Sequence, residues 1–131
     1  MVQDAGLSYR LPFATWENVA GPMHSYVVRF GDCSGPQDVR DFLATWAHVE
    51  AQDWPYHLTM DMTQLGCIPA GSMLQVASFI NQLHGGTLLT SSAIVAPRSW
   101  MRTLIRALFV IAPPVAPVVV VKCASDLVQV A

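Results

Sequence analysis

Apolar positions recur along the chain with two spacings, and each spacing predicts a different kind of element. Three segments repeat apolar side chains every three to four residues, which is the spacing of one face of an amphipathic helix. The first segment follows Ser34, Pro36 and Gln37, an arrangement typical of a helix start with a capping box. The apolar positions of the three predicted helices are Val39, Phe42, Leu43, Trp46 and Val49; then Leu74, Val76, Ala77, Ile80 and Leu83; then Trp100, Met101, Leu104, Ile105, Leu108 and Phe109.

Runs rich in β-branched and aromatic residues alternate with these segments and predict strands. They lie within residues 23–30, 56–62, 87–96 and 118–122. The last run is an unbroken series of valines, which predicts a strand buried on both faces. Residues 7–13 are a candidate first strand, and residues 125–131 are a candidate closing helix capped by Ser125.

The alternation of strands and helices predicts an α/β fold in a single domain spanning residues 1–131. We expect a mixed, mostly parallel sheet of four to five strands flanked by three to four helices. A chain of 131 residues is long enough to bury a hydrophobic core of its own.

The composition narrows the class of partner. Hydrophobic residues make up 53% of the chain and charged residues only 12%, well below the usual share of charge. A chain with this composition is expected to leave some apolar side chains on its surface, where they could contact a protein partner or form a homodimer. The net charge of −2 argues against nucleic-acid binding. The longest apolar run, residues 109–121, is broken by three prolines and is too short to span a membrane.

Residue types that often carry chemistry are scattered rather than clustered. Cys33, Cys67 and Cys123 form no CxxC pair, which favours reduced thiols and a cytoplasmic location, as does a start without a secretory signal. The four histidines have no metal-ligand spacing, so neither a metal nor a cofactor is predicted. Cys67 has only His57 as a nearby base, and nothing in the sequence positions the pair. The chain is therefore predicted not to be an enzyme.

The main candidate site is the corner within residues 57–74, where a predicted strand ends at Asp61 and a turn leads into the next helix. Many α/β proteins place working residues at such corners. Asp61 has two interpretations: a site residue at the carboxyl end of a strand, or an acceptor for backbone N–H groups of the following turn. Gly66, Cys67 and Met73 are the candidates for contact with a partner in this turn.

Ser72 and three arginines complete the set of candidate residues. Ser72 stands at the predicted helix start, where it either receives a phosphate or caps the helix. Arg98, Arg102 and Arg106 recur every four residues and so form one stripe on a helix. The stripe is either a surface facing a phosphate, a lipid headgroup or an acidic partner, or simply the solvated face of the helix.

Two quoted segments carry a family resemblance. "LTMDMTQLGCIPAGSMLQVASFINQLHGG" joins a strand ending in Asp61 to a turn and a helix that stops near glycine, and "APVVVVKCASDLVQVA" ends the chain. Together with the order of elements from Ser25 onward, they resemble the STAS/SpoIIAA-like superfamily. Residues 69–73 fall where that family has Asp-Ser-Ser/Thr-Gly-Leu. The family's phosphorylatable serine position holds Ala70, and Ser72 replaces it only if the turn shifts by two residues.

The resemblance implies a non-enzymatic module that binds a protein partner, or a second copy of itself, through the corner at residues 66–73. An alternative comes from the related CRAL-TRIO domains, which hold lipids between their sheet and a mobile helix. That alternative implies a small apolar or lipid ligand. An anionic headgroup on such a ligand would then face the arginine-bearing helix over residues 98–111.

Overall fold

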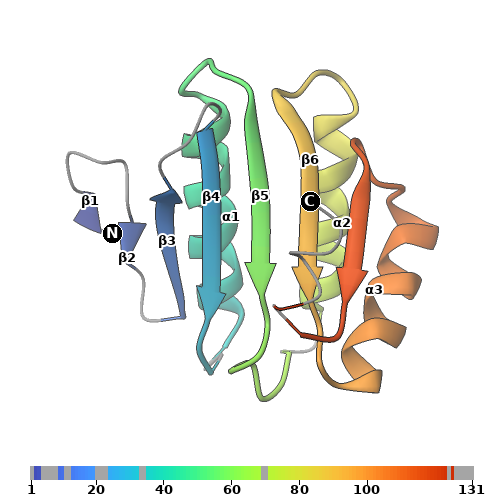
Figure 1. Ribbon diagram of the computed structural model, residues 1–131. Coiled ribbons are helices and arrows are strands. Elements are labelled where there is room, and N and C mark those ends of the chain that lie inside the picture. The colour runs from blue at the N-terminus through green and yellow to red at the C-terminus, as the bar shows by residue number, and fades with distance from the viewer. Residues whose placement is uncertain are drawn as a thin grey trace.

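The computed structural model describes residues 2–3, 9–10, 13–19, 24–32, 35–68, 71–123 and 125. Within this part of the chain the elements are β1 (Val2–Gln3), β2 (Tyr9–Arg10), β3 (Ala14–Val19), β4 (His24–Phe30), α1 (Pro36–Glu50), β5 (Tyr56–Asp61), α2 (Ser72–Leu83), β6 (Leu89–Val95), α3 (Ser99–Ile111) and β7 (Val118–Val121). The strands form one sheet in the order of the sequence (Figure 1). The predicted α/β class is confirmed.

The connections explain where the helices lie. Strands β1 to β4 are antiparallel neighbours, whereas β4, β5, β6 and β7 pair in parallel. Each parallel step passes through one helix, and such crossovers are right-handed. Because the parallel strands add in one direction, α1, α2 and α3 cover the same face of the sheet (Figure 1). In the described part of the chain, the other face carries no helix.

The core lies between the helix-covered face of the sheet and the helices, and its aromatic part lies under α1. The ring of Trp16 on β3 lies 6.2 Å from that of Tyr26 on β4 and 5.6 Å from that of Phe42 on α1. The indole Nε1–H of Trp46 on α1 donates a hydrogen bond of 2.8 Å to the hydroxyl of Tyr56 on β5. These contacts fix α1 firmly over β4 and β5.

Strand β3 is absent from the sequence prediction. Its side chains alternate, with Ala14 and Trp16 buried and Thr15 and Glu17 exposed. The strand pairs antiparallel with β4 along its whole length. The sequence predicts a first strand over residues 7–13. Of these residues, the structure describes Phe13 and the two residues of β2.

The prediction that residues 118–122 form a strand buried on both faces is wrong in its burial. Among the described strands β7 pairs with β6 alone, so it forms an edge of the sheet. Val120 is 37% exposed, whereas Val121 is buried. A run of valines marks a strand but does not distinguish a central strand from an edge strand. Ser125 lies in a turn, and the rest of the predicted closing helix, residues 126–131, lies outside the described residues.

The helix starts also differ from the prediction. Helix α1 begins after Gly35 and has no side-chain capping bond, while the Gln37 amide donates to Asp41 instead. Ser34 lies outside the described residues. On α2, Leu74 is 66% exposed, so it does not face the core as its spacing predicts.

Candidate functional site

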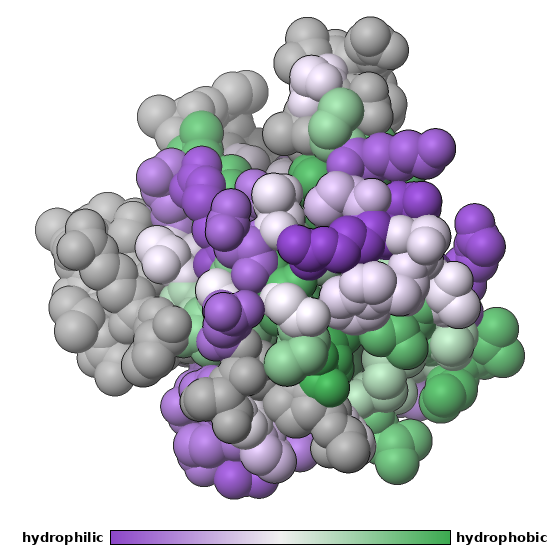
Figure 2. Space-filling view, turned by 90° about the horizontal axis from the view of Figure 1, so that it is seen from below, coloured by the Kyte–Doolittle hydropathy of each residue, from purple (hydrophilic) through white to green (hydrophobic). Residues whose placement is uncertain are grey.

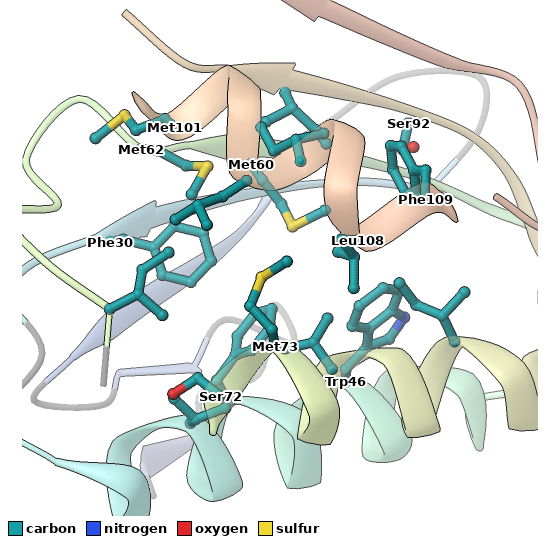
Figure 3. A pocket seen from close by; sticks show the side chains of 18 of the residues that line it. Phe30, Trp46, Met60, Met62, Ser72, Met73, Ser92, Met101, Leu108 and Phe109 are labelled. Carbon is teal, nitrogen blue, oxygen red and sulfur yellow. The ribbon is translucent and has the colours of Figure 1, made fainter. Parts of the chain in front are cut away.

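An apolar cavity of about 150 Å³ lies between the sheet and its layer of helices. Its wall is formed by side chains from all three helices, from β4, β5 and β6, and from the turns that follow β5 and α3 (Figure 3). Ser72, Ser92 and Cys67 are the residues of the wall that carry a hydroxyl or thiol group. The remaining wall is hydrocarbon, aromatic or thioether, and it includes Phe42, Trp46, Met60, Val76, Ile94 and Leu108.

A cavity of this size is an informative feature, because protein interiors are close-packed and hold few voids larger than a water molecule. An apolar cavity of about 150 Å³ that was engineered into another protein stays dry and binds benzene. Met60 illustrates the incomplete packing around the cavity. It lies on the helix-facing side of β5 in the middle of the sheet and is nevertheless only half-buried.

Methionine is concentrated around the cavity. Four of the six methionines of the chain line it, namely Met60, Met62, Met73 and Met101. The side chains of Met60 on β5 and Met73 on α2 point toward one another across the space (Figure 3). Thioether side chains are flexible and polarisable, so they adapt to ligands of different shape. The wall is therefore apolar and also adaptable.

Asp61 shapes the turn after β5. Its Oδ1 accepts hydrogen bonds from the backbone N–H of Thr63 at 3.0 Å and from the Thr63 hydroxyl at 2.5 Å. Of the two interpretations of Asp61, the structure bears out the acceptor for the following turn.

Gly66 and Cys67 are exposed in the same turn, which runs close to Asp32 after β4. A Cβ atom at Gly66 would lie 2.7 Å from Asp32 Oδ1, so a larger residue here would require the exposed Asp32 side chain to move. Cys67 is a free thiol at the wall of the cavity. Pro69 and Ala70 lie outside the described residues.

Ser72 is the first residue of α2, and it does not cap the helix. Gly71 takes the N-cap position with a φ of 83°, and no side-chain capping bond is present, so the capping interpretation is wrong. Ser72 is 2% exposed, and its Oγ has no hydrogen-bond partner among the described residues. Phosphorylation of Ser72 stays a prediction, and it would require the start of α2 to open toward a kinase.

Two arginines of the predicted stripe bind backbone carbonyl oxygens, and the third is exposed. Arg98 Nη1 donates to the carbonyl oxygen of Leu65 at 2.5 Å, and Arg102 Nη1 donates to that of Ala96 at 2.8 Å. These two side chains therefore brace the turns that follow β5 and β6. Arg106 is exposed on α3. Seen from the carboxyl ends of the parallel strands, hydrophilic side chains cross the middle of this edge, and hydrophobic ones gather toward α2 and α3 (Figure 2).

A pair of polar side chains, His57 and Ser91, lies on the helix-free face of the sheet. His57 Nδ1 lies 2.5 Å from Ser91 Oγ on the neighbouring strand β6. Burial lowers the pKa of His57, which favours the neutral imidazole. Side chains alternate between the faces of a strand, so His57 points away from the cavity that Met60 lines. His57 is therefore not brought together with Cys67, for which it was the nearby base in the sequence.

Three further observations concern metal sites, membrane-spanning helices and known proteins. Among the described residues, no group of three or more His, Cys, Asp or Glu side chains could hold a metal ion. No helix in the described ranges has the length and apolar character that crossing a bilayer requires. Comparison with known proteins finds no match to the chain, whether among family models, curated proteins or solved structures.

Sequence reasoning missed most of the wall of the cavity. Of its residues, only Cys67, Ser72 and Met73 were candidate site residues, and all three came from the corner. The number of methionines is a signal in the sequence that could have pointed to the others.

Proposed function

We propose that the protein is a non-enzymatic binder of a small apolar ligand, which it holds between its sheet and its helices. The observation that carries this proposal is the apolar cavity of about 150 Å³. Ligand sites are typically concave and mostly apolar, with a few polar groups. The CRAL-TRIO domains within the resemblance also hold their ligands between sheet and helix, which supports the same location.

Two contributions would favour the binding of a ligand in this cavity. It would remove its own apolar surface from water, which contributes about 25 cal/mol for each Å² buried. It would also restore the dispersion contacts that the side chains of the wall lack around an empty space. The half-buried Met60 and the other thioethers would pack against it without strain.

We expect toluene to bind in the cavity and to shift the methyl resonances of the four methionines in its wall. The measurement is a titration of protein with isotope-labelled methionine methyl groups, followed by NMR. In a Val76→Phe variant the new ring projects from α2 into the cavity and occupies the ligand's place, so the shifts should disappear. The variant should also be slightly more stable than the native chain, by about 0.5–2 kcal/mol, as for other cavity-filling changes.

The matched control is Leu74→Phe, which adds a ring of the same kind to the exposed side of α2. This variant should bind toluene as the native protein does. If the methionine methyl groups of the native protein do not respond to saturating toluene, or if Val76→Phe responds equally, the cavity is not a ligand site.

A second candidate function is docking of a protein partner, or of a second copy, through the corner at residues 66–73. It is favoured by the exposure of Gly66 and Cys67 in this turn. Three large apolar side chains are also exposed on α2 and α3, namely Leu74 at 66%, Val110 at 83% and Ile111 at 52%. Exposed apolar groups on neighbouring helices are typical of interaction surfaces.

For docking to a second copy, we expect light scattering to report a dimer that dissociates on dilution. Leu74→Glu should shift this equilibrium toward the monomer, because a carboxylate would have to lose its water at the interface. The control is Thr103→Glu, at an exposed position on α3. A mass of one chain at every concentration would contradict self-association.

A further inference from the structure

The cavity has an unsatisfied polar group in its wall, where α2 begins. We propose that its ligand is a small monocarboxylate with a compact apolar body. The carboxylate would bind at the start of α2, against Ser72, and the body would fill the cavity. This inference rests on the proposed function and adds the chemical class of the ligand.

The first argument is the Ser72 hydroxyl. The side chain lines the cavity, is 2% exposed, and has no hydrogen-bond partner for its Oγ among the described residues. A buried hydroxyl without a partner destabilises a fold, so each such group in a native structure needs an explanation. Serine does not serve here as a cap, since Gly71 holds that position. A ligand oxygen that accepts the Ser72 proton would provide the missing partner.

The second argument is the end of the helix at which Ser72 stands. A helix leaves its first N–H groups without intrahelical acceptors and carries a partial positive charge at this end. No hydrogen bond to a described residue involves the amides of Ser72 and Met73. The first turn of α2 also contains no acidic residue, whereas that of α1 contains Asp38. Backbone amides at a helix start are well suited to bind a carboxylate.

The third argument is room at this position. A Cβ atom placed on Gly71 would meet no other atom within 4 Å, so the helix start is open on that side. Arg98 adds positive charge at the same edge of the sheet, because its guanidinium is bound to the carbonyl oxygen of Leu65, a residue of the wall. A carboxylate at this position would meet the Ser72 hydroxyl and the first amides of the helix.

The size of the cavity limits the apolar body of the ligand. A volume of about 150 Å³ matches that of a cavity known to hold one benzene ring. The body is then a single ring or a short chain, and a long-chain lipid would not fit inside without movement of the helices. Phenylacetate combines such a ring with a carboxylate and is the probe of choice.

The experiment compares phenylacetate with toluene, which has the ring alone, on the native protein and on Ser72→Ala. Calorimetry and the methionine methyl resonances report both affinities. We expect phenylacetate to bind more tightly than toluene to the native protein. Ser72→Ala should raise the Kd for phenylacetate about tenfold, the usual effect of losing a hydrogen bond to a charged group. The Kd for toluene should change less than twofold.

Ser72→Ala should remain folded, and its Tm should equal or exceed that of the native protein, because the change removes a buried group without a partner. If toluene binds and phenylacetate binds no more tightly, or if Ser72→Ala weakens both alike, the carboxylate proposal is overturned while the cavity remains a ligand site. If neither probe binds the native protein, the proposed function fails as well.

Discussion

Replacing Trp16 by alanine should lower the free energy of unfolding by about 3–5 kcal/mol, the range for removal of a large aromatic side chain from a core. Trp16 is fully buried on β3, between Tyr26 of β4 and Phe42 of α1. Its loss would leave a void where sheet and helix meet. Equilibrium unfolding in guanidinium chloride, followed by circular dichroism, measures the change. For a domain with a typical stability of about 5–15 kcal/mol, the loss is a large fraction of the total.

Trp16→Phe is the matched control. It keeps an aromatic ring against Tyr26 and Phe42, and it removes an indole N–H that has no hydrogen-bond partner among the described residues. We therefore expect a clearly smaller loss of stability than for alanine. If Trp16→Ala unfolds at the same denaturant concentration as the native protein, β3 does not belong to the cooperative core.

Strand β3 shows why part of the fold escapes sequence reasoning. Its local pattern is weak, because Glu17 and Asn18 interrupt a strand of six residues. What holds β3 in place is its pairing with β4 and the packing of Trp16, and neither is visible in the local sequence. The three helices were predictable because each repeats apolar residues over several turns, a pattern that one packed face imposes directly.

The burial of individual residues is less predictable than the elements that contain them. The valines of β7 form a strand as predicted, but Val120 is exposed because β7 forms an edge of the described sheet. Leu74 has helical spacing with the core positions of α2 and nevertheless faces solvent. In both cases burial depends on what packs against the element, and the sequence of the element does not contain that information.

The sequence pointed to only one part of the candidate site. The corner after β5 indeed contributes Cys67, Ser72 and Met73 to the wall of the cavity. A cavity is an absence of atoms between elements that are distant in sequence, and no motif encodes it. Ser72 illustrates the difference, since a serine at a helix start is usually a cap, and here it is a buried hydroxyl in a cavity wall.

Raising the pH above about 10, the ordinary pKa of a tyrosine, should steadily destabilise the protein. Burial, and then the hydrogen bond to Glu50, raise the pKa of Tyr56 far above this value. The unfolded chain loses the proton of Tyr56 near pH 10, whereas the folded chain retains it. The stability that this proton provides is therefore complete below pH 10 and falls above it, by about 1.4 kcal/mol per pH unit for one such group. Burial also raises the pKa of Tyr26, which adds to the slope.

The geometry around Tyr56 explains the effect. Its hydroxyl donates to Glu50 Oε2 at 2.5 Å and accepts from Trp46 Nε1 at 2.8 Å, and the hydroxyl of Thr87 donates to the same carboxylate oxygen. A tyrosinate at this position would be fully buried beside a carboxylate. Tyr56→Phe should reduce the loss of stability between pH 10 and 11 by about 1 kcal/mol, because the tyrosine of the unfolded chain goes from half to mostly ionised over this range. It should also cost about 1–3 kcal/mol at neutral pH, because the buried Trp46 N–H loses its acceptor.

Guanidinium chloride unfolding at a series of pH values tests this prediction, and tyrosine absorbance reports ionisation directly. Glu50→Gln isolates the effect of the neighbouring charge, because it retains a hydrogen-bond acceptor for the Tyr56 hydroxyl and removes the carboxylate. Burial is the larger cause, so Glu50→Gln should keep most of the alkaline slope that Tyr56→Phe loses. If Tyr56→Phe instead shows the same slope as the native protein, the loss of stability at high pH comes from other groups, and Tyr56 ionises in the folded protein as freely as in the unfolded chain.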